Sequence, residues 1–314
     1  MLKKFLVLCS LFCVACSSSN LEKLETQNEK QGALKLLFVG DLLLDRGVHE
    51  RIERTGIESL FTQSIDSVFS ENDIVVANLE CPATIIEEPI NKKYIFRAEP
   101  IWLSTLKKHG VTHLNLANNH SMDQGRNGLV DTDKNIQENE MIPLGYGKNV
   151  KEACQPFLIA KEPRSIYLLS SLQVPSENWL YFEDKSCVCE KPLSDIETQI
   201  RELKKKDKNC IVIVQLHWGI EHVVIPNMSQ KQAAFGLVNA GADCIIGHHP
   251  HVVQTVEKIN NVPVFYSIGN FIFDQKKPIN SRGLMIQLEI TDSTLKADTI
   301  PFVIDKCVPN LIYE

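Results

Sequence analysis

The 314-residue sequence lacks several features that mark particular classes of protein. Its 33 lysines and arginines are spread along the chain, and the formal net charge is −6. A nucleic-acid-binding role is not expected, because such proteins carry clustered positive charge. A long apolar run is also missing. The stretch from Phe5 to Val14 is shorter than the roughly 20 residues of a membrane-spanning helix.

Other absences concern the domains and the cysteines. After residue 33 there is no Pro/Ser-rich or charge-rich break and no internal repeat, so residues 34–314 are expected to form one domain. Cys187 and Cys189 lack a second cysteine pair at zinc-finger spacing and lie too close for an easy mutual disulfide, which argues against a structural zinc site. Cys210 and Cys244 lie in apolar runs and are predicted to be small core residues.

The N-terminal segment is typical of an exported, membrane-tethered protein. A basic start precedes the apolar stretch and Cys16 is followed by Ser-Ser-Ser-Asn, so residues 1–16 resemble a bacterial lipoprotein signal in which Cys16 would be lipidated. Cys13 departs from that pattern, where leucine or a similar residue is usual. An ordinary cleaved secretory peptide and an uncleaved anchor are the alternatives. With lipidation, residues 17–33 would tether the domain to a membrane, in the cell envelope outside the cytoplasm.

Apolar runs of strand length alternate with polar, helix-like segments, which predicts a layered α/β domain. Strands are expected at 33–40, 73–78, 111–117, 165–170, 210–218, 243–247 and 262–269. Helices are expected at 57–70, 100–109, 125–139, 192–208 and 229–240. Segments 282–290 and 295–304 leave no room for a helix between them and are predicted to pair antiparallel. Residues 174–190 fit no period and are predicted to be a surface insertion.

Polar residues follow five of the expected strands. The first strand leads into Asp41, later strands end near Glu80, Asn119 and His217, and "CIIGHHPH" ends in three histidines. Ligands bind at the carboxyl ends of strands in α/β sheets. Several carboxylates and imidazoles packed together without a cation would leave charges unpaired. Mixed oxygen and imidazole ligands suit manganese, iron(II) or zinc and argue against calcium.

Seven ordered motifs make the resemblance to a family specific. They are "VGDLLLDRGV", "ANLECPAT", "YIFRAEP", "LANNHSMDQG", "VQLHWGIEH", "GADCIIGHHPHVVQ" and "FYSIGNFIFD". In order and wording they resemble the poly-γ-glutamate capsule biosynthesis protein (CapA) family, which is similar to calcineurin-like metallophosphoesterases. The resemblance covers nearly all of residues 34–275. It implies a four-layer α/β/β/α sandwich of two mixed sheets, with a two-metal centre at the strand ends.

The resemblance also implies a ligand set. The expected metal ligands are Asp41, Glu80, Asn119, His217, His249 and His251. Glu80 takes the place of a bridging aspartate, and Leu43 stands where the metallophosphoesterases generally have a histidine. His248 with His251 is an alternative register for the last two ligands. These departures would change metal choice, lower the occupancy of one site, or mark a centre no longer used on phosphate esters.

Four further residues are candidates for catalysis or substrate binding. By the same resemblance, His120 protonates the leaving group or steadies the transition state. Glu221 is predicted to orient His217 or to act as a base. Arg46 and Arg97 could hold a substrate phosphate or carboxylate, the alternative being a surface or capping role. For Asp123, a role at the start of the following helix is favoured.

The leading functional hypothesis is a membrane-tethered, extracytoplasmic, metal-dependent hydrolase acting in capsule or exopolymer biosynthesis. Its cofactors would be two divalent ions, and its substrate an anionic phosphoester or γ-glutamyl polymer. Its partners would be the membrane, through Cys16, and capsule-synthesis membrane proteins. The alternative is a non-catalytic capsule-assembly or polymer-binding lipoprotein with a degenerate metal site. A third hypothesis is a structural lipoprotein that retains only remnants of the site.

Overall fold

Alternate side chains of β1 (Leu34–Leu42) face two different hydrophobic layers. In the computed structural model, which describes residues 32–175, 177 and 182–312, Leu36 and Phe38 pack between two sheets. Leu37 and Val39 pack on the other side, against helices. Because successive side chains of a strand point to opposite faces, a strand that is apolar at every position is buried on both.

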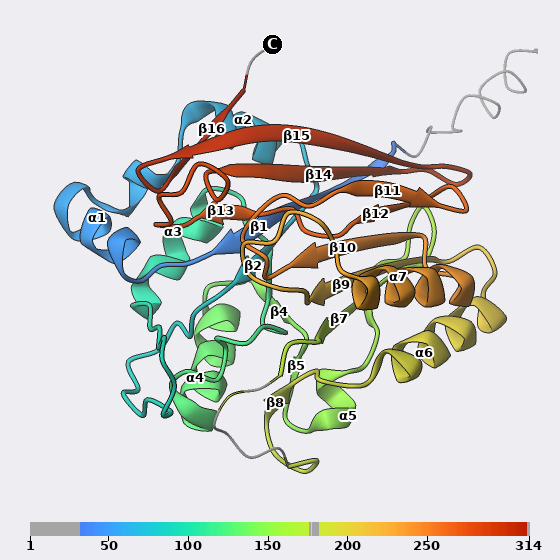
Figure 1. The fold of residues 1–314 in the computed structure, drawn as a ribbon, viewed down its shortest axis with the longest axis horizontal. Coiled ribbons are helices and arrows are strands. Elements are labelled where there is room, and N and C mark those ends of the chain that lie inside the picture. Colours follow the sequence, from blue (N-terminus) through green and yellow to red (C-terminus); the bar gives the residue numbers. More distant parts are fainter. Residues whose placement is uncertain (1–31, 176, 178–181, 313–314) are drawn as a thin grey trace, which may run out of the picture. The chain divides into compact units, whose positions relative to one another are not determined.

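Two sheets face each other across the first of these layers (Figure 1). The larger has the order β16-β15-β14-β1-β2-β3-β4, and β13 pairs with β1. Its other strands are β2 (Ile74–Leu79), β3 (His113–Asn115), β4 (Ile142–Leu144), β13 (Asn270–Ile272), β14 (Arg282–Ile290), β15 (Leu295–Asp305) and β16 (Val308–Leu311). The second has the order β11-β12-β10-β9-β7-β6. Its strands are β6 (Phe157–Ala160), β7 (Ile166–Leu172), β9 (Ile211–His217), β10 (Cys244–His248), β11 (Val256–Ile259) and β12 (Val262–Phe265).

Helices cover the outer face of each sheet. The first sheet packs against α1 (Gly47–Thr55), α2 (Gln63–Ser70), α3 (Leu103–Lys108) and α4 (Gly125–Glu138). The second packs against α6 (Leu193–Lys206) and α7 (Met228–Ala240). The short elements are η1 (Ile57–Leu60), η2 (Pro100–Trp102), α5 (Val150–Ala153) and the pair β5 (Tyr146–Gly147) and β8 (Cys187–Val188). The predicted α/β/β/α sandwich is confirmed.

Most expected elements occur near their expected positions. The antiparallel pairing of 282–290 with the following segment is confirmed in β14 and β15. The expected helix at 57–70 is instead two elements, η1 and α2, because Thr62 is extended and caps α2 with its side chain. Helix α1 was not expected from the sequence, because only Val48 and Ile52 are buried in it.

The cysteines stabilise the region around β8. Cys154 forms a disulfide with Cys189. The expectation that 174–190 is a surface insertion is therefore wrong at its end, where Cys187 to Cys189 are buried. Cys210 and Cys244 are fully buried, as predicted. The predicted signal at residues 1–16 and residues 17–31 of the predicted tether at 17–33 lie outside the described residues. Within the described residues, no helix is both long and apolar enough to cross a membrane.

Candidate metal centre

The register of the parallel strands brings the predicted ligands together. Asp41 at the end of β1 lies opposite Asn78 of β2, and His217 at the end of β9 lies opposite His248 of β10. Gly40 permits a close approach of β13, because a Cβ at this position would lie 2.0 Å from the carbonyl oxygen of Gly269. Both sheets thus contribute strand ends to one centre.

Asp41 is fully buried and is held by donors from three sides. Its Oδ1 accepts a hydrogen bond of 2.8 Å from the Asn78 amide and lies 3.2 Å from His248 Nδ1. Its Oδ2 lies 3.2 Å from His251 Nδ1. Burial alone would raise the pKa of Asp41, but the adjacent His248 and His251 hold it well below its usual range. Asp41 is therefore an ionised carboxylate.

Glu80 is fully buried, and neither of its carboxylate oxygens has a hydrogen-bond partner. Its Oε1 lies 3.5 Å from His251 Nε2 and 3.8 Å from His217 Nε2. Burial raises the pKa of Glu80 well above its usual range, and Asp41 adds to this effect. A buried carboxylate without donors is costly unless a cation accompanies it. One ligand atom each from Asp41, Glu80 and His251 lie within 4.8 Å of one another, so these residues fit a divalent ion.

His251 is oriented by an amide that the sequence alone did not assign. Its Nδ1 lies 2.9 Å from Asn270 Oδ1, which leaves Nε2 directed at Glu80. Glu80 and Asp41 outweigh the effect of burial and raise the pKa of His251 to about 9. His251 and His249 also adopt positive φ angles of 56° and 95°. Such strained non-glycine conformations cluster at functional sites.

A second group of predicted ligands also adjoins Glu80. His217 Nε2 is 2.7 Å from Asn119 Oδ1, and the His217 and His249 rings lie 4.9 Å apart. Burial, followed by the neighbouring His249, holds the pKa of His217 well below its usual range. Burial and the proximity of His251 lower the pKa of His249 to about 4. Both imidazoles are therefore neutral, as metal ligands must be.

Both of the proposed registers of the histidine cluster place a residue near the centre. His248 lies against Asp41, and its Nε2 contacts the Gln215 side chain at 2.9 Å. His249 Nδ1 has no hydrogen-bond partner and lies beside His217. His248 Nδ1 also lacks a hydrogen-bond partner, so His249 is favoured as a partner of His217 by its position beside that ring. Leu43 is buried in the core beneath the helices, so the first motif offers no imidazole there.

His120 belongs to a buried chain of charged groups. Its Nδ1 lies 2.8 Å from Asp123 Oδ2, and Asp123 Oδ1 lies 2.8 Å from Lys92 Nζ. The His120 ring stacks on Phe96 at 4.1 Å, and burial lowers the pKa of His120 despite Asp123. The expected helix-start role of Asp123 is wrong, because Gln124 is the N-cap of α4 and the Asp123 carboxylate turns toward His120.

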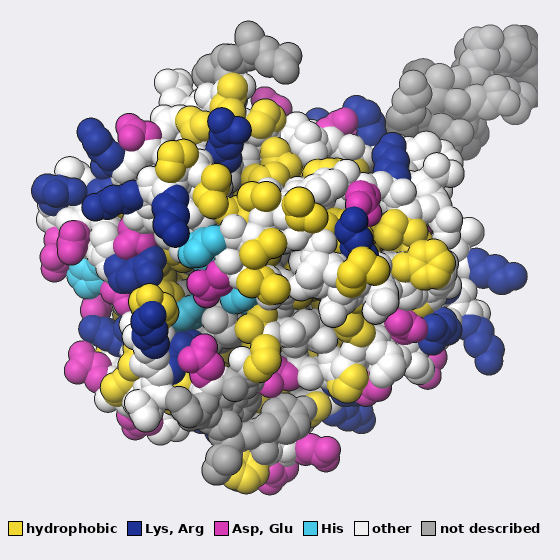
Figure 2. Space-filling view, viewed as in Figure 1, with side chains coloured by type: hydrophobic (Ala, Val, Ile, Leu, Met, Phe, Trp, Pro, Cys, Tyr) yellow, Lys and Arg dark blue, Asp and Glu magenta, His cyan; other side chains and the backbone are white. Residues whose placement is uncertain are grey.

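A pocket of about 110 Å³ opens over the centre. Its walls are Arg46, Tyr94, Phe96, His120, Glu221, His222, His251, Phe273 and Gln275. Figure 2 shows histidine side chains gathered around an acidic side chain on this face. We call the 110 Å³ pocket the metal pocket.

The remaining candidates differ in position. Arg46 bonds to Asp274, and its guanidinium carbon lies 4.9 Å from the Phe96 ring centre. Glu221 was predicted to orient His217 or to act as a base, and it lines the mouth of the metal pocket. The ring nitrogens of His217 instead contact Asn119, Asn78 and Glu80.

Arg97 is not among the residues that line the metal pocket. It pairs with Glu99 and Glu87 and donates to the Thr84 carbonyl oxygen. The structure therefore brings Arg46 and Glu221 to the pocket but not Arg97.

Known proteins resemble this chain over the residues that form this centre. The sequence model of a family described as "Bacterial capsule synthesis protein PGA_cap" matches residues 35–275. The "PGA biosynthesis protein CapA" of Bacillus subtilis (strain 168) is 30% identical over 285 residues, covering 88% of this chain and 73% of that protein. The "Capsule biosynthesis protein CapA" of Bacillus anthracis is 29% identical over 290 residues, covering 90% and 70%. A hypothetical protein of known structure from Thermus thermophilus has a TM-score of 0.48 and 12% identity, covering 85% of this chain and 99% of that chain.

Proposed function

Because the chain belongs to the PGA_cap family of bacterial capsule synthesis proteins, we propose that it is a metal-dependent hydrolase acting on an anionic polymer during capsule or exopolymer biosynthesis. The substrate class that we favour is a γ-linked glutamyl chain, since a relative is named for PGA biosynthesis. A phosphoester is the alternative substrate class.

The buried carboxylate of Glu80 carries this proposal. Its Oε1 lies near both His251 and His217, and neither of its oxygens has a hydrogen-bond donor. Asp41, Glu80 and His251 would hold one divalent ion, and Glu80, Asn119, His217 and His249 would hold another. The mixed oxygen and nitrogen donors suit manganese, iron or zinc. Bound ions of this kind lower the pKa of water and polarise ester or amide oxygens.

His120 supplies the proton in this proposal. Asp123 holds its Nδ1, so the unprotonated Nε2 of the neutral ring takes a proton from the attacking water and then delivers it to the leaving group in the metal pocket. Lys92 balances the charge of Asp123 and keeps the carboxylate in place. Arg46 lies in the same wall, anchored by Asp274, and binds an anionic group of the substrate.

Metal content and hydrolysis separate the parts of this proposal. We expect the full chain, purified in detergent and reconstituted with manganese, to bind metal and to cleave poly-γ-glutamate or a chromogenic phosphodiester. His217→Ala should lower both metal content and rate. His120→Ala should keep the metal and lower the rate by roughly 10²- to 10⁴-fold. His109→Ala, which replaces a histidine that pairs with Glu58 and Asp66 next to α3 and does not line the metal pocket, is the matched control.

Two results would contradict the proposal. Equal rates for wild type, His217→Ala and His120→Ala, with near-stoichiometric metal in the wild type, would exclude catalysis at this centre. Absence of metal after reconstitution with manganese, iron and zinc in turn would exclude the centre itself.

A second candidate function is a non-catalytic capsule-assembly protein that binds metal or polymer. Leu43 favours it, because a core leucine replaces one expected ligand. Metal binding and polymer binding without turnover would support this candidate over the hydrolase.

We also propose that the protein acts outside the cytoplasm and is tethered through a lipid on Cys16. The Cys154–Cys189 disulfide supports export, because structural disulfides persist in oxidising compartments. The proposed partners are the membrane and capsule-synthesis membrane proteins. Cys16→Ser should release the protein from the membrane fraction, and mass spectrometry of the N-terminal peptide should show the lipid in the wild type. A wild type found in the soluble fraction would contradict the tether.

A further inference from the structure

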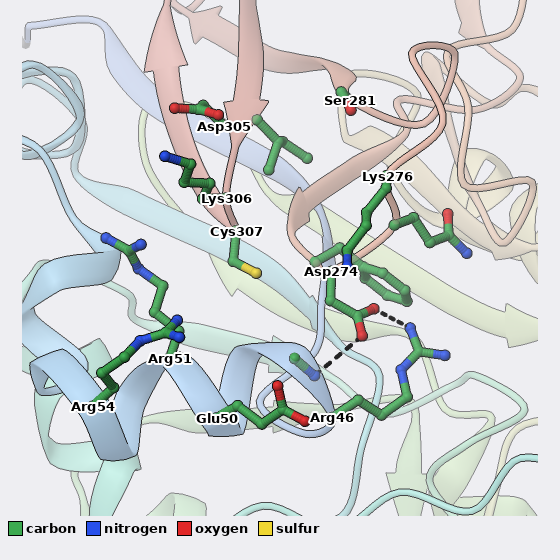
Figure 3. A pocket seen from close by; sticks show the side chains of 14 residues that line it. Arg46, Glu50, Arg51, Arg54, Asp274, Lys276, Ser281, Asp305, Lys306 and Cys307 are labelled. Atoms are coloured by element: carbon green, nitrogen blue, oxygen red, sulfur yellow. Dashed lines mark hydrogen bonds and ion pairs between the residues drawn. The ribbon is translucent and has the colours of Figure 1, made fainter.

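A second and larger cavity, of about 660 Å³, opens beside the metal pocket. The two share Arg46, Phe273 and Gln275 in their walls. Figure 3 shows α1 on one side of this cavity, the turn between β15 and β16 on another, and the segment after β13 on a third. We call it the basic pocket.

Residues on one face of α1 line the basic pocket. Gly47, Glu50, Arg51 and Arg54 line the cavity at spacings of three, four and seven residues from Gly47. Such spacing places side chains on one face of a helix. Val48 and Ile52 are packed into the core on the opposite side. The charged face is therefore held rigidly in place by the buried one.

The charge of the basic pocket is opposite to that of the whole chain. The lining residues are Arg46, Arg51, Arg54, Lys276 and Lys306 on the basic side and Glu50, Asp274 and Asp305 on the acidic side. Asp274 already pairs with Arg46. Arg51 Nε has no hydrogen-bond partner, and in the described part of the chain Arg54, Lys276 and Lys306 form no ion pair with a carboxylate. The lining therefore has an excess of two positive charges, although the chain has a formal net charge of −6.

We propose that the basic pocket binds the carboxylates of a polyanionic chain of the γ-linked glutamyl class while the bond to be cleaved lies in the metal pocket. This inference rests on the proposed function. Guanidinium groups recognise carboxylates through paired hydrogen bonds, and a γ-linked glutamyl chain carries one carboxylate per residue. Arg46 stands where the cavities join, so a chain that leaves the metal pocket along this wall next meets Arg51 and Arg54.

Binding of poly-γ-glutamate by charge-matched variants tests the proposal. We compare wild type, Arg51→Gln/Arg54→Gln and Lys205→Gln/Lys206→Gln. The second pair removes the same charge from α6, on the opposite outer layer. The arginine pair should raise Kd roughly tenfold, since two exposed ion pairs together contribute about that factor. A Kd for the arginine pair within about twofold of the lysine pair would overturn the proposal.

Alkylation of Cys307 tests the proposal in the wild-type protein, so no substitution is needed. Among described thiols Cys307 alone is not buried, and it lines the basic pocket. Poly-γ-glutamate should slow alkylation of wild-type Cys307 by the neutral reagent iodoacetamide, followed by mass spectrometry of the peptide that contains it. An unchanged rate at saturating polymer would overturn the proposal.

The two proposals can fail separately. Polymer binding that depends on Arg51 and Arg54, in a protein without hydrolysis, would support the basic pocket and contradict the hydrolase. Hydrolysis with the same KM for wild type and Arg51→Gln/Arg54→Gln would support the hydrolase and overturn the basic pocket.

Discussion

Replacement of Glu80 by glutamine should have opposite effects on the metal-free and the metal-bound protein. The wild-type carboxylate is buried without a donor, and its pKa in the folded protein is raised well above the usual range. A carboxyl group with a raised folded pKa destabilises the fold as pH rises from the unfolded pKa to the folded one. The loss is roughly 1.4 kcal/mol for each pH unit between them. Without metal, Glu80→Gln should therefore be at least as stable as wild type at pH 8.

With metal bound, wild type should be more stable than Glu80→Gln. An ion present at 100 times its Kd stabilises the folded state by about 2.7 kcal/mol, which raises Tm by roughly 5 °C for a chain of this size. Glu80→Gln removes a charged ligand of both proposed ions, and a 1,000-fold weaker affinity would leave a shift of less than about 1 °C at the same metal concentration. Thermal unfolding followed by circular dichroism, with and without manganese, measures both effects.

The matched control is Glu221→Gln, which neutralises a carboxylate at the mouth of the same pocket whose side chain is 47% exposed. It should keep the full metal-dependent rise in Tm. If Glu80→Gln kept the same rise as wild type, or if its metal-free form were clearly less stable than wild type at pH 8, our account of Glu80 would be refuted.

Three further predictions test other parts of the structure. Asp123→Asn should lower the rate less than His120→Ala and should shift the pH profile of kcat, whereas a change in stability alone would leave the profile in place. Cys154→Ser should lower the free energy of unfolding by about 4 kcal/mol, because the disulfide closes a loop across a sequence separation of 35, and a reductant should abolish the difference from wild type. Burial lowers the pKa of His113 to about 4, so the free energy of unfolding should fall by roughly 3 kcal/mol as pH drops from 6.5 to 4. His113→Gln should flatten this slope, and an unchanged slope would show that other groups cause it.

Local sequence patterns were enough to predict the strands that carry the centre. Runs such as 33–40 and 210–218 are apolar at nearly every position, which is the pattern of strands buried on both faces, and they became β1 and β9. The polar residue after each run was therefore conspicuous. Helix α1 has no such apolar pattern and could not be predicted. Its charged face lines a pocket, and only two of its residues are buried.

Contacts across the centre could not be predicted, because they join residues that are far apart in the chain. Asn78 bonds to Asp41 and faces His217, and Asn270 orients His251, yet neither amide differs in sequence from an ordinary loop or strand residue. Arg97 illustrates the same limit: its motif suggested substrate binding, whereas the fold surrounds it with Glu87 and Glu99.

The sequence by itself therefore determined the layered fold class and the kinds of ligand at the strand ends, because periodicity and residue type are local properties. Only the tertiary structure decided which of these residues meet. Two sheets packed face to face bring β1 and β10 together, so that Asp41 lies 3.2 Å from His248 and Glu80 is enclosed without a donor. The same packing places the charged face of α1 beside the metal pocket, and this juxtaposition defines the basic pocket.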